Sequence, residues 1–233
     1  MEMLSQYPHY KKRIALILCN PHQLPSVAYD VKILTPMLIK LGFKIHIVFS
    51  NPFNIQVDGV ETLTFCHNKR EMLNAIDYAL SLVDDQTSLY LHISSHGSTT
   101  MAKTEKVQTE SGIKSEGVEY IQFCWNDGCE RIYDSELNKL LLQRLPSCQV
   151  LAAIDTCHSA TMLNLLSSIH YLGSHIQVQH NLGSPSVNAE VFCLAPTIDQ
   201  KVTVEAARGG LLTNQICRHL PSCSSITDLF IRC

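Results

Sequence analysis

The chain has 233 residues, of which 45% are hydrophobic and 17% are charged, so its composition is that of a globular protein and excludes bulk disorder. A net charge of −3, without a basic stripe, excludes electrostatic attraction to nucleic acid as a main function. Ten cysteines are scattered without a C-x-x-C pair, so we expect free thiols in a cytoplasmic protein and no zinc site.

The first apolar run covers residues 14–19 and is followed by Asn20 and Pro21. Its six residues are too few for a membrane span or a signal-peptide core, so we expect no membrane contact. A short continuous apolar run is typical of a parallel strand that is buried on both faces. Apolar residues then recur at helical spacing over residues 27–41, and a second strand is predicted over residues 43–49.

The same alternation continues through the rest of the chain. Helices are predicted over residues 68–83, 134–144 and 210–220, and strands over residues 89–94, 150–154 and 191–194. Residues 99–119 are polar and predict a mobile loop or a hairpin, whereas residues 167–188 predict a polar connection that carries histidines.

Strands that alternate with helices predict an α/β fold. We expect a three-layer sandwich, in which a mostly parallel sheet of five main strands is covered by helices on both faces. Ligands of such sheets bind beyond the carboxyl ends of the strands. His96 and Cys157 each follow closely on a predicted strand, so we expect both side chains at the same edge of the sheet.

A cysteine next to a histidine can carry out acyl transfer. The thiolate is the nucleophile, and a nearby imidazole both raises the thiolate fraction and protonates the leaving amine. The developing oxyanion needs backbone N–H donors, and the glycine that follows His96 lets the backbone approach closely. Either residue alone is most often structural, but here each of them follows a strand of the same predicted sheet.

Residues 93–97 read Ile-Ser-Ser-His-Gly, and residues 154–159 read Ile-Asp-Thr-Cys-His-Ser. These segments resemble the histidine and cysteine motifs of metacaspases, a family of caspase-like cysteine peptidases. The similarity extends to residues 24–31 and 132–137, and it covers most of residues 13–230. It implies the caspase-like form of the three-layer sandwich.

The resemblance implies a role for each matching residue. Cys157 is expected to be the nucleophile and His96 the general acid/base, and the N–H groups of Gly97 and Cys157 are expected to form the oxyanion hole. The residues that match the specificity pocket of the family are Asp155, Asp30 and Ser94. Two carboxylates and a hydroxyl suit a guanidinium or an ammonium group, so we expect protein or peptide substrates that are cut after Arg or Lys.

Calcium activates many metacaspases, and Asp134 matches one of the aspartates that hold it. Ser135 and Asn164 stand at two positions where acids would be expected. Calcium takes about six to eight oxygen ligands and gains affinity from carboxylate charge. We therefore expect weak or absent calcium dependence and no required cofactor.

The whole chain, residues 1–233, is interpreted as a single peptidase domain. It divides into a large-subunit-like part over residues 1–165, a connecting segment over residues 166–188 and a small-subunit-like part over residues 189–233. The last part is shorter than in the family, because thirteen residues follow Leu220. We expect an open sheet edge there, and a monomer rather than a dimer.

Two functions from different classes stay open. A cysteine endopeptidase is favoured because both Cys157 and His96 are present. The alternative is a catalytically weak or inactive caspase-like scaffold that regulates a peptidase or a cell-death pathway, and the short C-terminal part favours it. A third reading, a peptidase that cuts after Asn, is opposed by the acids at positions 30 and 155.

Overall fold

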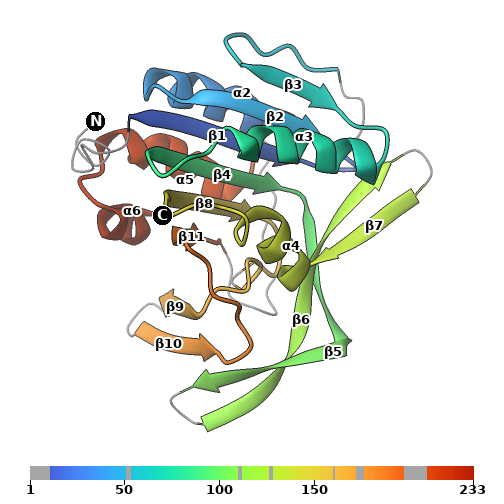
Figure 1. Cartoon of the computed structure of the whole chain (residues 1–233), viewed down its shortest axis with the longest axis vertical. Coiled ribbons are helices and arrows are strands. Elements are labelled where there is room, and N and C mark those ends of the chain that lie inside the picture. The colour runs from blue at the N-terminus through green and yellow to red at the C-terminus, as the bar shows by residue number, and fades with distance from the viewer. Residues whose placement is uncertain are drawn as a thin grey trace.

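The computed structural model describes residues 11–50, 54–109, 112–125, 128–159, 161–171, 176–196 and 209–233. Its centre is a six-stranded sheet in the order β11-β8-β4-β1-β2-β3, and every neighbouring pair is parallel (Figure 1). These strands are β1 (Lys12–Cys19), β2 (Lys44–Phe49), β3 (Thr62–Phe65), β4 (Thr87–Ser94), β8 (Gln149–Asp155) and β11 (Glu190–Leu194).

Helices cover both faces of this sheet, which confirms the predicted three-layer sandwich. The helices are α2 (Ser26–Lys40), α3 (Lys69–Ser81), α4 (Asp134–Leu141), α5 (Leu211–His219) and α6 (Ile226–Arg232), with a short 3-10 turn, η1, at Leu220–Ser222. Alternate side chains of β1 enter two separate cores: Leu16 packs with α3 and α4, whereas Ile17 packs with α2, α5 and α6. The period of two along a buried strand is the reason for this division.

A second, antiparallel sheet stands at the carboxyl edge of the first (Figure 1). Its strands are β5 (His96–Thr109), β6 (Gly112–Trp125), β7 (Gly128–Tyr133), β9 (Ser167–Tyr171) and β10 (Ile176–Asn181), in the order β7-β6-β5-β10-β9. Of the two options for residues 99–119, the hairpin is confirmed. Residues 167–188, predicted as a polar connection, contain a hairpin that the prediction missed, in which β9 pairs with β10.

The parallel sheet also has six strands where five were predicted. The additional strand, β3, is four residues long and half-buried, so it carries no continuous apolar run that the sequence would reveal. The residues after Leu220 contain helix α6, in which Leu229 is the buried anchor. That part is therefore folded onto the sheet as a helix.

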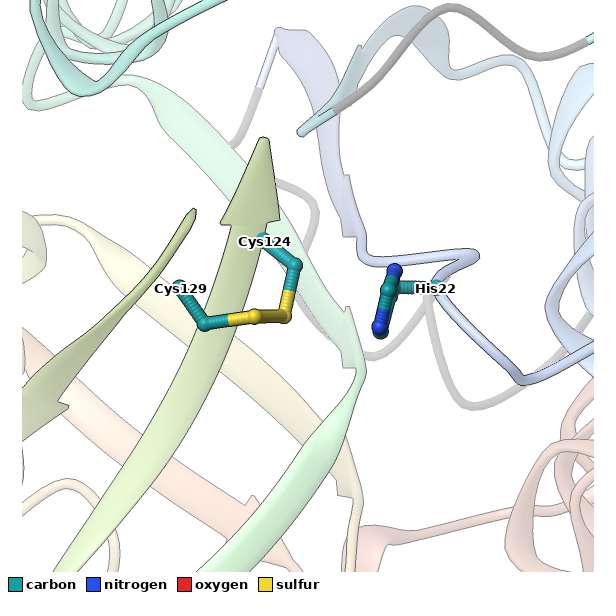
Figure 2. A group of neighbouring side chains, drawn as sticks. All are labelled: His22, Cys124 and Cys129. Atoms are coloured by element: carbon teal, nitrogen blue, oxygen red, sulfur yellow. A yellow bond between two sulfur atoms is a disulfide. The ribbon is translucent and has the colours of Figure 1, made fainter. Parts of the chain in front are cut away.

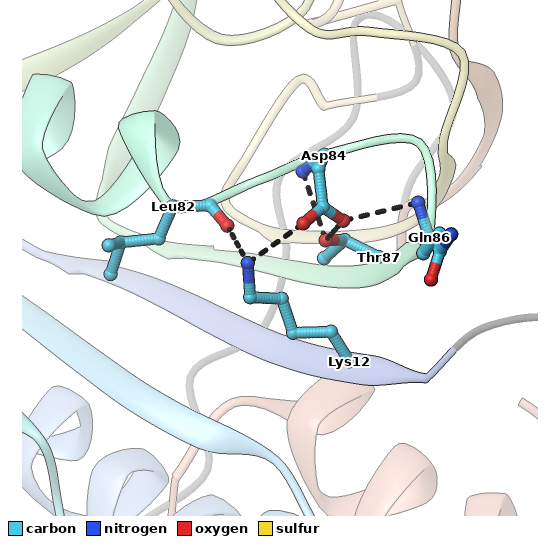
Figure 3. A network of polar contacts seen from close by, with 5 residues as sticks. All are labelled: Lys12, Leu82, Asp84, Gln86 and Thr87. Carbon is cyan, nitrogen blue, oxygen red and sulfur yellow. Dashed lines mark hydrogen bonds and ion pairs between the residues drawn. The ribbon is translucent and has the colours of Figure 1, made fainter.

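A compact turn leads from α3 into the first residue of β4, Thr87 (Figure 3). Lys12 on β1 donates to the Leu82 carbonyl at 2.7 Å and to Asp84 Oδ2 at 2.9 Å. Asp84 also accepts from Thr87 Oγ1 at 2.6 Å and from the Gln86 N–H at 3.1 Å. The hydrogen bond from Thr87 and the Lys12 ammonium lower the pKa of Asp84. These bonds hold β4 beside β1, where Lys12 pairs with Thr87.

Within the described ranges, no helix is both long enough and apolar enough to cross a membrane.

Candidate active site

The two predicted catalytic residues lie at the carboxyl edge of the parallel sheet. β4 and β8 are neighbours, and Ser94 pairs with Asp155 where both strands end. His96 and Cys157 each stand two residues beyond this pair, so the register of the strands brings their backbones together. Both residues are partly exposed, which leaves them accessible to a substrate.

Gly97 packs directly on the backbone of Cys157. An ideal Cβ placed on Gly97 would lie 2.1 Å from the Cys157 carbonyl oxygen and 2.8 Å from Thr156 Oγ1. No real Cβ tolerates such a contact, so glycine is required at this position. The absence of a side chain lets the His96 segment approach the Cys157 segment to contact distance.

A sharp turn follows Cys157 and is held against the second sheet. His158 has φ 51°, a left-handed conformation that non-glycine residues adopt rarely. After this turn, the N–H and Oγ1 of Thr161 both donate to Oε2 of buried Glu119, at 3.2 and 2.6 Å. Because Glu119 lies on β6, these bonds fix the segment that carries Cys157.

The imidazole of His96 is oriented by a backbone carbonyl. Its Nε2 lies 3.0 Å from the oxygen of His22. A carbonyl can only accept, so this contact places a proton on Nε2 and leaves the Nδ1 lone pair of the neutral ring as the basic position. Residue types gave no signal for His22, because a backbone oxygen is present at every position. The Asn-Pro pair after β1 was the one indication that the chain turns at this edge.

Asn20 connects the segments around this edge. It is fully buried, and its Nδ2 donates to the Gln122 carbonyl at 2.5 Å. Its Oδ1 accepts from Ser50 Oγ at 2.9 Å and from the His22 N–H at 3.4 Å. Ser95 Oγ donates to the same Gln122 carbonyl at 2.8 Å. The segments that carry His22 and His96 are thus both tied to β6.

The three predicted pocket residues come together, and all three are buried. Ser94 Oγ donates to Asp30 Oδ2 at 2.9 Å, and the Gly210 N–H donates to Asp30 Oδ1 at 2.8 Å. The N–H and Oγ1 of Thr213 donate to Asp155 Oδ2 at 2.9 and 2.5 Å. Two acids from distant parts of the chain therefore lie in one neighbourhood.

Burial shifts the pKa values of two groups in this neighbourhood, Asp155 and His92. Burial raises the pKa of Asp155, and the two hydrogen bonds from Thr213 oppose that rise. His92 is buried with Nε2 3.5 Å from Thr213 Oγ1, and burial lowers its pKa to about 3. His92 is neutral at physiological pH for that reason, so it brings no positive charge to Asp155.

Gly209 and Gly210 pack against both carboxylates. An ideal Cβ on Gly210 would lie 2.0 Å from Asp155 Oδ2, and one on Gly209 would lie 2.6 Å from Asp30 Oδ1. Gly209 also has φ +97°, where side chains are strained. The diglycine thus occupies the space beside the two acids. Glycine has no functional side chain, so nothing in the sequence marked these two residues as part of the site.

The residues that match the calcium site of the family do not fit the ion. Asp134 is buried, and its Oδ1 accepts the N–H of Ser135. Asn164 offers a neutral amide whose Oδ1 already accepts from Asn181 and, at 3.0 Å, from Ser184 Oγ. In the part of the chain that the structure describes, Asp134 belongs to no group of three or more His, Cys, Asp or Glu side chains that could hold a metal ion. Such a donor set lacks the carboxylates that calcium requires.

Two of the cysteines correct the expectation of free thiols. Cys124 and Cys129 stand directly opposite each other on β6 and β7 and form a disulfide (Figure 2). The imidazole of His22 lies beside this disulfide. The remaining cysteines form no disulfide, as expected: Cys19, Cys66, Cys148, Cys157, Cys193, Cys217, Cys223 and Cys233. The pairing depends on the register of a hairpin, which composition alone does not reveal.

A thiol and a carbonyl-oriented imidazole at the carboxyl edge of a parallel α/β sheet define a caspase-like site of the cysteine peptidase class. The sequence matches the caspase domain family over residues 12–233, and the chain belongs to that family. No curated protein matches it significantly. The crystal structure of protein GSU0716 from Geobacter sulfurreducens is similar, with a TM-score of 0.54 and 17% identity. The match covers 89% of this chain and 81% of that one, and it shows a shared fold.

Proposed function

We propose that this chain is a metacaspase-like cysteine endopeptidase that cuts proteins after Arg or Lys. Cys157 is the nucleophile, His96 is the general acid/base, and the N–H groups of Gly97 and Cys157 form the oxyanion hole. The observation that carries this proposal is the shared strand register. Ser94 pairs with Asp155, and just beyond this pair Gly97 packs on the Cys157 carbonyl.

The contacts of His96 support its role. With its Nε2 proton held by the His22 carbonyl at 3.0 Å, the ring accepts the thiol proton on Nδ1. The thiolate attacks the scissile carbonyl, and the resulting oxyanion is stabilised by backbone N–H donors. The imidazolium then returns its proton to the leaving amine, and water hydrolyses the acyl-enzyme. The carbonyl of His22 keeps the ring in one orientation throughout.

The preference for a basic residue rests on Asp30 and Asp155. Both carboxylates are buried, and the neutral His92 near Asp155 supplies no charge there. A guanidinium or ammonium group that enters beside them gains charge-assisted hydrogen bonds, whereas an acidic side chain is repelled. Because Gly210 contacts both acids, a substrate side chain reaches them after the diglycine segment shifts. The proposal needs no metal and no cofactor.

The test is cleavage of fluorogenic peptides that place Arg, Lys, Asp or Asn before the scissile bond. Cys157→Ala is the inactive variant, and Cys233→Ala, which alters an exposed free cysteine, is the matched control. We expect release from the Arg and Lys peptides that is lost in Cys157→Ala and retained in Cys233→Ala. Release that survives in Cys157→Ala contradicts the assigned nucleophile. Folded protein that cuts none of the four peptides supports the non-catalytic scaffold instead.

A further inference from the structure

Three side chains that can ligate a metal meet beside His96. The ligand atoms of His22, Cys124 and Cys129 all lie within 4.8 Å of one another (Figure 2). His22 belongs to the turn after β1, and the two cysteines close the β6–β7 hairpin. These segments are far apart in the sequence, so the fold itself creates the cluster.

The cluster is accessible from solvent. A hydrogen bond that does not involve the disulfide holds the turn that carries His22 against the β6–β7 hairpin. His22 and Cys129 are exposed, and Cys124 is buried. Asn20 Nδ2 donates to the Gln122 carbonyl at 2.5 Å, which ties the turn after β1 to β6. Breaking the sulfur–sulfur bond leaves this tie in place. A reductant from solution can reach the exposed side, and the imidazole remains next to the released thiols.

We propose that the reduced hairpin binds a zinc-class divalent cation through Cys124 Sγ, Cys129 Sγ and the His22 imidazole, and that the disulfide is its metal-free state. A small dithiol supplies two electrons and two protons. Its own thiols become a disulfide, and Cys124 and Cys129 become thiols. The cation then replaces the two thiol protons, which pass to solvent, and binds two thiolates and one neutral imidazole. Oxidation of the hairpin by a disulfide oxidant reverses these steps and releases the ion.

The distances suit such an ion. Zinc bonds sulfur at about 2.3 Å and imidazole nitrogen at about 2.0–2.1 Å, which places tetrahedral ligands roughly 3.5–3.8 Å apart. The ligand atoms already lie within 4.8 Å of one another, so rotation of the two cysteine side chains brings them into range. Three protein ligands leave one coordination position for water.

The site is adjacent to the proposed catalytic histidine. The carbonyl of His22 contacts His96 Nε2, and the imidazole of the same residue is the metal ligand. A bound ion therefore holds the residue that orients His96. This link to activity rests on the proposed function, whereas the metal site itself does not depend on it.

The experiment uses the full chain with Cys157→Ala, so that Cys157 and His96 together cannot bind the added ion. The protein is reduced with a phosphine, separated from it, and titrated with Zn²⁺ in a calorimeter and with Co²⁺ in a spectrophotometer. We expect one ion per chain, with a thiolate-to-cobalt charge-transfer band. The oxidised protein is expected to show neither. Thiol titration of the denatured wild-type chain is expected to count eight thiols when oxidised and ten when reduced.

His22→Ala is the decisive variant because it removes the imidazole and keeps the backbone contacts of that residue. We expect it to weaken zinc binding at least about tenfold, by loss of one of three ligands. His67→Ala, which removes another exposed histidine, is the matched control and is expected to bind as the parent does. Equal affinity in His22→Ala and the parent overturns the proposed ligand set. Equal binding by oxidised and reduced protein, or no binding by the reduced protein, overturns the proposal as a whole.

Discussion

Replacing Gly97 with alanine is expected to push the segment that carries His96 away from the segment that carries Cys157. The new Cβ would lie 2.1 Å from the Cys157 carbonyl oxygen, whereas carbon–oxygen contacts in proteins lie at about 3.3 Å or more. The two backbones must therefore move apart by roughly 1 Å, because the nearest atom is backbone and cannot rotate away. Overpacking of this kind costs about 1–3 kcal/mol of folding stability. A displacement of about 1 Å at reacting groups costs about 10²-fold in rate.

The assay compares kcat/KM on an Arg peptide and urea unfolding for Gly97→Ala and Gly183→Ala. Gly183 is the matched control because the nearest atom to its ideal Cβ, Asn181 Oδ1, is 3.8 Å away, an ordinary contact. We expect Gly97→Ala to lose about 10²-fold in kcat/KM, with a stability loss of about 1–3 kcal/mol. Gly183→Ala is expected to resemble the wild type in both kcat/KM and stability. A Gly97→Ala variant with wild-type activity and stability would refute the close approach of these segments.

Four further predictions concern the interior and the pocket. Thr213→Val removes a hydroxyl that donates to buried Asp155, and it is expected to cost about 1.5–3 kcal/mol in urea unfolding at neutral pH, whereas Thr213→Ser retains stability. His92 has its pKa lowered from 6.5 to about 3, so stability is full above pH 6.5 and falls as the pH drops toward 3, by at most about 5 kcal/mol. His92→Gln is expected to flatten this slope, and an unchanged slope would exclude His92 as its source. Asp155→Asn is expected to lower kcat/KM on Arg peptides by about 10²–10⁴-fold, since removing one partner of a buried charge pair costs about 3–5 kcal/mol. Calcium and a chelator are expected to leave kcat/KM unchanged, and a calcium-dependent gain would contradict the misfit at Asp134.

The fold class followed from periodicity because buried parallel strands leave continuous apolar runs. β1 and β4, with all or nearly all of their residues buried, were found at almost their observed bounds. Of the second sheet, the sequence predicted only one hairpin, over residues 99–119, as one of two alternatives. The pairing of its strands depends on long-range contacts that local patterns do not encode. The four-residue strand β3 was missed for the same reason.

The residues of the site that act through a reactive side chain could be predicted from the sequence. Cys157 and His96 follow strand ends, and strand order brings them together. The carbonyl of His22 and the packing of Gly209 and Gly210 could not be predicted, because backbone groups have no residue signature. The Cys124–Cys129 disulfide depends on the register of β6 and β7, which is set by the folded hairpin.

In the proposed mechanism, Cys157 and His96 act as one catalytic unit, and an acidic pocket binds the basic side chain of the substrate. The most direct measurement is kcat/KM on Arg and Asp peptides for the wild type, Cys157→Ala and His96→Ala. We expect a preference for Arg, and loss of activity in both variants. Activity on Asp peptides in preference to Arg would contradict the pocket, and activity that persists without His96 would contradict the proposed proton transfer.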